Sequence, residues 1–328
     1  FLVCLLLAPV SAFTQQDTGD QKTVEFGFDL LPFVGTSSAL PDANREVSIN
    51  LVGGLSGGIE KAELGGVLNV TTGGVNGAQL SGAANVVSGT VNGAQLSGSL
   101  NIVGESVNGV QGAGAVNVAA MGVSGLQGAG ALNISSGDLM GLQGAGAVNV
   151  VVGDVMGAQA AGAANIVPGD VMGGQLGVFN VAVGEVKGGQ IGVFNYARAS
   201  TRSVGLISIV PEGFTEVEIF ASEEGLTLAG LRHGTERIYN VYYAGSRLTA
   251  DGPDFAFGLG LGWRRPLVPS WELNIDVTGT HVVTDGNWEK GDSLTKFRTF
   301  GAWRANDRFA VFGGPTITMH LSEKESEE

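Results

Sequence analysis

Apolar and polar positions in the middle of the chain follow one repeating order, roughly V-x-G-x-Q-x-x-G-x-x-N-[VI]. The unit recurs every sixteen residues up to Asn165, and two shorter steps of fifteen residues follow. A period this short indicates that one small structural unit is stacked on itself. Frequent Gly and β-branched Val disfavour helix. We therefore predict two short strands per unit, for example Val155–Gln159 and Ala163–Val167.

The repeat predicts an all-β fold that begins with a parallel β-solenoid of sixteen-residue coils, about nine of them, spaced ~4.8 Å apart. Each recurring Asn and Gln would then meet the same residue of the next coil, and the amides would form hydrogen-bonded structural ladders. One antiparallel hairpin per unit is the alternative, but it gives no reason for an amide at the same place in every unit. The ladder positions are Asn69, Asn85, Asn101, Asn117, Asn133, Asn149, Asn165, Asn180, Asn195, Gln79, Gln95, Gln111, Gln127, Gln143, Gln159, Gln175 and Gln190.

The last part of the chain shows long strands of alternating character instead. No aromatic residue occurs from 51 to 178, whereas all four tryptophans lie after residue 260. Large apolar residues alternate with Gly and Ala in Asp254–Trp263, and with polar residues in Trp271–His281. Eight antiparallel strands are expected here, as a β-sandwich or a barrel-like domain. The other six are predicted at Val204–Val210, Glu216–Ala221, Gly225–Leu231, Arg237–Ala244, Thr295–Arg304 and Arg308–His320.

These changes of pattern predict five segments. They are a signal-peptide remnant (1–12), a leader or cap with one strand (13–48), the solenoid (49–200), the antiparallel domain (201–320) and an acidic tail (321–328). The leader strand, Val24–Val34, is expected to cap the repeats or to pair with the C-terminal sheet. The antiparallel domain is expected to cover the exposed strand edges at the end of the solenoid.

An apolar run followed by Val10-Ser11-Ala12 fits the small-x-small cleavage rule of a secretory signal. It predicts export to the cell surface or the outer membrane, with the periplasm as the alternative. Cys4 is the only cysteine, so no disulfide is expected in the mature chain. Only 15% of residues are charged and the net charge is −14, which argues against nucleic acid as a partner because phosphate binding needs a basic patch.

Four acidic residues recur five positions after the Asn, and stacking would align them about 5 Å apart, where like charges repel. Calcium bound between them would relieve this repulsion, whereas the alternative is a set of solvated turn residues. The four candidates are Asp138, Asp154, Asp170 and Glu185.

Other candidate chemistry is sparse. His233, His281 and His320 lack metal-ligand spacing, and no Gly-x-Ser-x-Gly motif occurs. Exposed amide ladders could bind sugar, but internal ladders need no ligand. Three tyrosines (Tyr239, Tyr242, Tyr243) and the four tryptophans are expected in the core of the C-terminal domain, with a glycan or lipid-interface site as the alternative.

The repeats resemble a known family. Units such as Gly141–Asn149, Gly173–Asn180 and Gly188–Asn195 are similar to surface-repeat proteins of Bacteroidetes and spirochaetes, the LA_2272-type repeats. The resemblance implies an exported, envelope-associated protein and brings no enzymatic activity with it. It covers most of the chain from about residue 47, through Val47–Ser56, Gly205–Gly213, Tyr239–Gly245 and Phe312–Pro315.

We therefore predict a non-catalytic envelope protein with a structural or adhesive role and no cofactor. Envelope components, glycans or host and neighbouring proteins are the expected partners. The first alternative is an outer-membrane β-barrel protein whose C-terminal strands contact lipid, which is also the expected route of any membrane association. The second is a polysaccharide-active solenoid enzyme, which would need paired carboxylates on one face. Residues 64–200 contain five acidic residues, four of them at one turn.

Overall fold

The computed structural model describes residues 22–249, 252–284 and 287–321. The chain forms two compact units with the boundary between Glu185 and Val186. The predicted signal-peptide remnant and all but the first residue of the predicted acidic tail lie outside the described residues.

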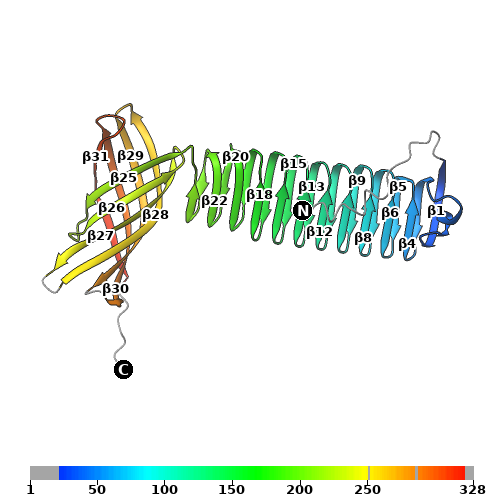
Figure 1. Ribbon diagram of the computed structural model, residues 1–328, viewed down its shortest axis with the longest axis horizontal. Helices are drawn as coiled ribbons and strands as arrows, with labels where there is room; N and C mark the ends of the chain where they lie inside the picture. The colour runs from blue at the N-terminus through cyan, green and yellow to red at the C-terminus, as the bar shows by residue number, and fades with distance from the viewer. Residues whose placement is uncertain (1–21, 250–251, 285–286, 322–328) are drawn as a thin grey trace, which may run out of the picture. The chain divides into compact units, whose positions relative to one another are not determined.

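The first unit is a parallel β-solenoid, as the repeat predicted (Figure 1). Each coil contributes a longer and a shorter strand, and equivalent residues lie opposite one another in successive coils. Gln111, for example, lies opposite Gln95 on one side and Gln127 on the other. The parallel pairing contradicts the hairpin alternative.

The longer strands of the first unit are β1 (Thr23–Leu31), β3 (Asn44–Asn50), β5 (Gly58–Gly65), β7 (Val75–Ser81), β9 (Val91–Ser97), β11 (Val107–Ala113), β13 (Val123–Ala129), β15 (Leu139–Ala145), β17 (Val155–Ala161) and β19 (Val171–Leu176). The shorter strands are β4 (Gly53–Ser56), β6 (Leu68–Thr71), β8 (Ala84–Val87), β10 (Leu100–Val103), β12 (Val116–Ala119), β14 (Leu132–Ser135), β16 (Val148–Val151), β18 (Ala164–Val167) and β20 (Phe179–Val186).

A glycine with positive φ stands two residues before each ladder Gln from Gln79 to Gln175. Gly141 has a φ of 136°, a conformation that residues with a Cβ rarely adopt. A Cβ at Gly141 would lie 2.0 Å from the backbone oxygen of Gly125 in the preceding coil. Close stacking of the coils therefore requires glycine at this position of the repeat.

The leader is the first coil of the solenoid, not a separate cap. β1 pairs in parallel with β3, so the predicted start at residue 49 and the predicted pairing with the C-terminal sheet are wrong. A short strand, β2 (Val34–Gly35), and one helical turn, α2 (Thr36–Ala39), follow β1. The repeat motif is missing from this coil because Asp29 lies in its interior and forms an ion pair with Arg45 of the next coil at 2.9 Å, with both side chains fully buried.

The second unit begins with further parallel strands, β21 (Gly189–Ile191), β22 (Phe194–Ser200), β23 (Ser203–Val204) and β24 (Ile207–Ile209). β21 pairs with β23, and β22 with β24. The coils thus reach Ile209, so the predicted boundary at 200 and the antiparallel strand predicted at 204–210 are wrong.

An amide from the antiparallel sheet caps the last of these coils. The Asn240 Nδ2 atom donates to the carbonyl oxygens of Gly205 and Leu206 at 2.8 and 3.0 Å, and its Oδ1 accepts from the Ser208 amide at 3.0 Å. The predicted capping of the last strand edge by the following domain is confirmed within this unit.

The rest of the second unit is one antiparallel sheet of eight strands rather than a two-layer sandwich. Its order follows the chain from β25 to β31, and β32 also pairs with β30. The strands are β25 (Phe214–Ala221), β26 (Thr227–Gly234), β27 (Ile238–Thr249), β28 (Gly252–Val268), β29 (Trp271–Thr284), β30 (Asn287–Arg304), β31 (Ala310–Gly313) and β32 (Thr316–Leu321).

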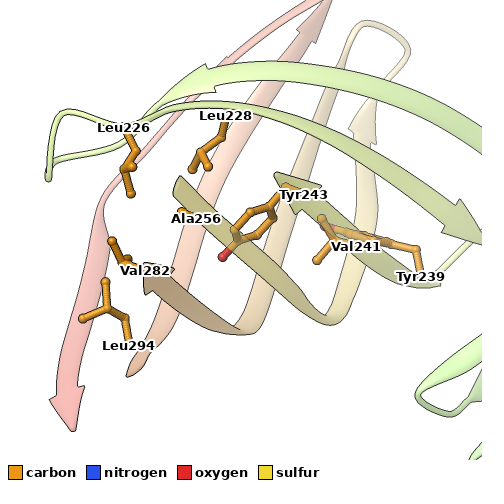
Figure 2. Packing of buried hydrophobic residues seen from close by; sticks show 8 residues of the cluster. All are labelled: Leu226, Leu228, Tyr239, Val241, Tyr243, Ala256, Val282 and Leu294. Atoms are coloured by element: carbon orange, nitrogen blue, oxygen red, sulfur yellow. The ribbon is translucent and has the colours of Figure 1, made fainter. Parts of the chain in front are cut away.

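One part of the buried face of this sheet is apolar. Tyr239 and Tyr243 are buried there, and the rings of Phe214 and Phe220 contact them edge-on at centroid distances of 5.6 and 5.7 Å. The expected core position is confirmed for these two tyrosines. Figure 2 shows the cluster, which consists of Leu226, Leu228, Tyr239, Val241, Tyr243, Ala256, Val282 and Leu294.

Candidate functional site: the charged interior of the antiparallel sheet

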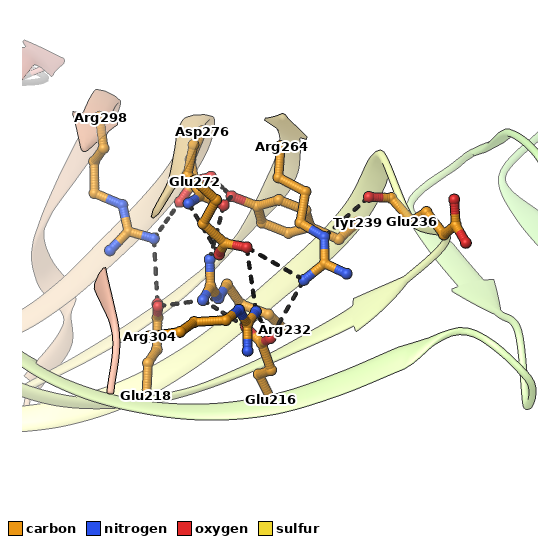
Figure 3. Close-up of polar contacts among 11 residues, drawn as sticks. Glu216, Glu218, Arg232, Glu236, Tyr239, Arg264, Glu272, Asp276, Arg298 and Arg304 are labelled. Atoms are coloured by element: carbon orange, nitrogen blue, oxygen red, sulfur yellow. Dashed lines mark hydrogen bonds and ion pairs between the residues drawn. The ribbon is translucent and has the colours of Figure 1, made fainter. Parts of the chain in front are cut away.

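The remainder of the buried face is lined with charged side chains (Figure 3). In β29, Glu272, Asn274 and Asp276 are at most 6% exposed, whereas Val277 on the opposite face is 50% exposed. Alternation along a strand puts every second residue on one face. Four carboxylates and four guanidinium groups interact there: Glu216, Glu218, Glu272, Asp276, Arg232, Arg264, Arg298 and Arg304.

Asp276 of β29 lies at the centre of this ionic cluster and contacts side chains of β27 and β30. Its carboxylate pairs with Arg298 and accepts a hydrogen bond from the Tyr239 hydroxyl. Glu218 pairs with both Arg298 and Arg232 at 3.3 Å. Each buried charge therefore meets an opposite charge, which buried ions require to offset the loss of hydration.

Glu216 is the second point where guanidinium groups converge. It pairs with Arg232 at 2.7 Å, with Arg264 at 3.3 Å and with Arg304. Glu272 pairs with Arg304 at 3.2 Å. Equal numbers of acidic and basic groups make the ionic cluster neutral overall, and its ion pairs connect strands β25, β26 and β28–β30.

The opposite face of the sheet is apolar although it is exposed. Phe255, Phe257, Leu259, Leu261 and Trp263 alternate along β28 and are 36–46% exposed. Their neighbours, such as Asp254 and Ala256, are buried. The sheet thus has the reverse of the polarity expected for a domain in water, where the exposed face is polar.

A hollow of about 350 Å³ lies beside the ionic cluster, with Phe220, Arg298, Phe300 and Phe312 in its lining. It lies where β25 approaches β31, and the Phe220 and Phe312 rings are 6.2 Å apart. Thr316 supplies the one side-chain hydroxyl in the lining of this hollow, which contains no His or Cys. Its chemistry is that of packed aromatic rings beside one paired guanidinium.

The predicted amide ladders are confirmed inside the first unit. Each Asn Nδ2 donates to the Oδ1 of the Asn in the next coil at 2.9–3.0 Å, from Asn50 through to Asn180. Each Gln Nε2 donates in the opposite direction, to the preceding coil, at 2.6–3.0 Å from Gln95 to Gln175. All these side chains are at most 2% exposed. They therefore cannot bind sugar.

The two ladder residues of the second unit also bond within that unit. Asn195 donates to the Val204 carbonyl at 2.9 Å and to the Ser208 hydroxyl at 3.4 Å. Gln190 donates to the Tyr196 carbonyl at 3.0 Å. A hydroxyl thus takes the place of the amide in the last coil.

The acidic column forms hydrogen bonds to the backbone. Asp138 Oδ1 accepts from the Asp154 backbone amide at 2.9 Å, Asp154 accepts from Asp170 at 2.8 Å, and Asp170 accepts from Glu185 at 2.7 Å. The three Asp carboxylates therefore each bind the backbone of the next turn. No group of three or more His, Cys, Asp or Glu residues within the described ranges could hold a metal ion.

The remaining candidates are not brought together. His233 lies at the end of the coils, where its Nε2 accepts from the Val210 amide at 2.9 Å. His320 lies 3.4 Å from Asp292 on the surface. The tryptophans were expected in the core, but Trp263, Trp271 and Trp303 are 38–49% exposed, so that expectation is wrong for them.

Glu63 is a buried acid that the sequence analysis did not single out. Glu63 precedes Gln79 by sixteen residues and lies opposite it in the preceding coil, where the repeat would put a Gln. The spacing alone could therefore have identified this position. Its Oε1 accepts from Asn50 at 2.9 Å and its Oε2 accepts from Gln79 at 2.7 Å. Burial raises the pKa of the Glu63 carboxyl, an effect that the hydrogen bonds from Gln79 and Asn50 only partly offset.

Comparison of the chain with models of known families, with curated proteins and with solved structures finds no match. Within the described residues, no helix is both long enough and apolar enough to cross a membrane.

Proposed function

We propose that this protein is a non-catalytic envelope protein whose antiparallel sheet is embedded in a lipid bilayer and tethers the solenoid to it. The single observation that carries the proposal is the reversed polarity of the sheet. Its exposed face is aliphatic and aromatic, and its buried face is charged. A contiguous apolar face that is exposed on a protein marks contact with lipid or with another protein.

The strand lengths support contact with lipid. β28, β29 and β30 have 17, 14 and 18 residues, and a tilted strand needs about 9–11 residues to cross the hydrocarbon layer. Trp263, Trp271 and Trp303 lie toward the ends of these strands, and their side chains are partly exposed. Amphipathic rings at strand ends suit the boundary between lipid and water.

The ionic cluster supports a role in anchoring rather than in transport. Its eight charged groups neutralise one another, and Asp276 is fully buried. A conducting interior would need charges that an ion can reach. A paired network holds the strands together where the apolar face cannot contribute a core.

The solenoid supplies the surface that the anchor would present. Its length and its regular coils suit a structural or adhesive role toward envelope components, glycans or neighbouring proteins. The resemblance of its repeats to envelope repeat proteins favours the same assignment. Its column of carboxylates is engaged with backbone amides, which favours a non-catalytic role over polysaccharide cleavage.

Tryptophan fluorescence tests the lipid contact directly, because all four tryptophans belong to the sheet. Full-length protein is mixed with lipid vesicles that carry bromine on the acyl chains, and the matched control is the same vesicles without bromine. We expect blue-shifted emission in both and strong quenching only with bromine. Unquenched emission from protein that stays in the aqueous fraction would refute the proposal.

A further inference from the structure

Two columns of outward-facing side chains flank the buried Gln ladder on the longer strands of the solenoid. We call the residue before each ladder position the pre-Gln column and the residue after it the post-Gln column. The pre-Gln column is Phe26, Val47, Ala62, Ala78, Ala94, Val110, Leu126, Leu142, Ala158 and Gly174. The post-Gln column is Phe28, Ile49, Leu64, Leu80, Leu96, Gly112, Gly128, Gly144, Ala160 and Leu176.

The two columns contain no charged residue, and their large members are exposed. Leu80 is 38% exposed, Leu126 is 47% and Leu142 is 54%. Next to the last two, Gly128 and Gly144 leave open space, because a Cβ built at either position meets nothing within 4 Å. The face is therefore a strip of apolar projections beside apolar hollows.

Projections and hollows exchange columns halfway along the solenoid. From Leu64 to Leu96 the large residue is in the post-Gln column and its neighbour is Ala. From Val110 to Leu142 the large residue is in the pre-Gln column and its neighbour is Gly. A two-fold axis across the strip, between the coils of Gln95 and Gln111, would put each of these large residues of one copy against Gly or Ala of another. The open hollows are at Gly128 and Gly144, whereas an added Cβ at Gly112 would lie 2.8 Å from the Leu96 side chain of its own chain.

We propose that this face binds the same face of a second copy of the chain, with the two solenoids antiparallel. Leu80 of one copy then faces Gly128 of the other, and Ala78 faces Leu126. In the eight coils from Val47 to Ala160, every facing pair holds four or five side-chain carbon atoms. Packed sheets need such even filling of the space between them.

A parallel, in-register dimer fits less well. It would put Phe26 against Phe28 and Val47 against Ile49 at one end, while Ala158 would meet Ala160 at the other. The space between the sheets would then be overfilled in two coils and underfilled in one. Antiparallel packing puts Phe26 against Gly174 and Phe28 against Leu176. Its overfilled pair therefore lies outside the eight coils from Val47 to Ala160, whereas the parallel dimer also overfills the coil of Val47.

The area suits a weak, concentration-dependent dimer. Eight coils spaced ~4.8 Å apart and a strip about 15 Å wide bury roughly 1,100 Å² in total, which is near the lower limit for a specific interface. Each chain leaves the solenoid at its C-terminal end, so the two chains leave an antiparallel dimer at opposite ends. If the antiparallel sheet is anchored in lipid as proposed above, such a dimer would join two membranes. Only this step rests on the proposed function.

Exchange of one projection and one hollow tests the arrangement. Gly128→Leu puts two Leu side chains against each other at two symmetric places, so we expect dimerisation of the full-length protein in detergent to weaken about tenfold or more. Leu80→Gly combined with Gly128→Leu moves the hollow to the other side and should restore the dimer. Sedimentation velocity over a range of protein concentrations measures both. Ala164→Leu, on the shorter strand β18, adds the same side chain to another face and is the matched control.

Three outcomes would overturn the proposal. They are a wild-type chain that stays monomeric, stronger association of Gly128→Leu, and rescue by Leu126→Gly with Gly128→Leu, which is the exchange that a parallel dimer requires. Clustering of vesicles that carry the protein is a separate readout, because it tests whether the dimer joins two membranes. Protein that dimerises in detergent but is not quenched by brominated lipid would contradict the anchor and leave the dimer standing.

Discussion

The carboxylate of Glu63 accepts a hydrogen bond from the side-chain amide of Gln79 at 2.7 Å. A carboxylate can only accept, so this contact makes Gln79 donate toward the first coils and sets the direction of the whole Gln ladder. The other carboxylate oxygen accepts from Asn50, whose Nδ2 also donates to Asn69. One buried acid therefore fixes two amide ladders that run in opposite directions.

Glu63→Gln should remove part of the pH dependence of solenoid stability. Burial raises the folded-state pKa of Glu63 above its ordinary value of 4.5, so the folded state holds this proton more tightly than the unfolded state. The stability contribution is full below the ordinary pKa and is lost as pH rises through the raised one. The stability of the variant relative to wild type should therefore increase with pH across that window.

Urea unfolding followed by far-UV circular dichroism, at several pH values from about 4 to 8, checks this prediction. Glu60→Gln is the matched control, because Glu60 is an exposed residue of the same strand, β5. If the difference in unfolding free energy between wild type and variant stays constant with pH, Glu63 has the same pKa in the folded and unfolded states.

Replacing an Asn in the middle of the buried Asn ladder by Ala should destabilise the solenoid. Asn133→Ala leaves the Asn117 Nδ2 donor, the Gly144 carbonyl and the Asn149 Oδ1 acceptor without their present partner. Buried polar groups without a partner cost about 1–3 kcal/mol each, so we expect a loss of about 3 kcal/mol or more in unfolding free energy.

The chain offers a close control for that truncation. Asn92 belongs to a second Asn ladder, between Asn76 and Asn108, which lies on the exposed face of the longer strands. Water replaces its partners when it is truncated, so Asn92→Ala should stay within about 0.5 kcal/mol of wild type. Equal losses for the two variants in urea unfolding would contradict the importance of burial.

The solenoid could be predicted from the sequence because parallel coils put the same residue into the same environment each time. Asn133 and its equivalents keep their identity since each one bonds to a copy of itself. The first coil was missed for the same reason. Its interior holds Asp29, which pairs with Arg45 of the next coil, rather than an amide ladder, so no repeat marks it.

The polarity of the antiparallel sheet could not be predicted in this way. Alternation in β28 separates Phe257 from Ala256, but it does not say which of the two faces is buried. The charged partners of that buried face lie far apart in the chain, as Glu218 and Arg298 do. Only the pairing of strands brings them together.

Loss of one buried carboxylate should destabilise the sheet. Glu218→Ala leaves Arg232 and Arg298 each with one acidic partner fewer in a buried setting, which costs about 3–5 kcal/mol when an ion pair is broken. Glu236 is the control, since it is exposed and its contact with Arg264 is made by its backbone carbonyl. Unfolding in detergent, followed by tryptophan fluorescence, should show a large decrease in unfolding free energy for Glu218→Ala and almost none for Glu236→Ala.

A charge placed on the exposed apolar face separates a lipid-facing sheet from one that faces water. Leu259 lies near the middle of β28 and is 46% exposed. In a bilayer, Leu259→Arg should cost about 2–4 kcal/mol, and Leu267→Arg, near the end of the same strand, about 0–1 kcal/mol. Leu259→Phe keeps the face apolar and should change little. Urea unfolding of the protein in lipid vesicles, followed by tryptophan fluorescence, measures all three. In water, an exposed Arg at either position would be nearly neutral, so a cost that depends on position along the strand is the signature of lipid around it.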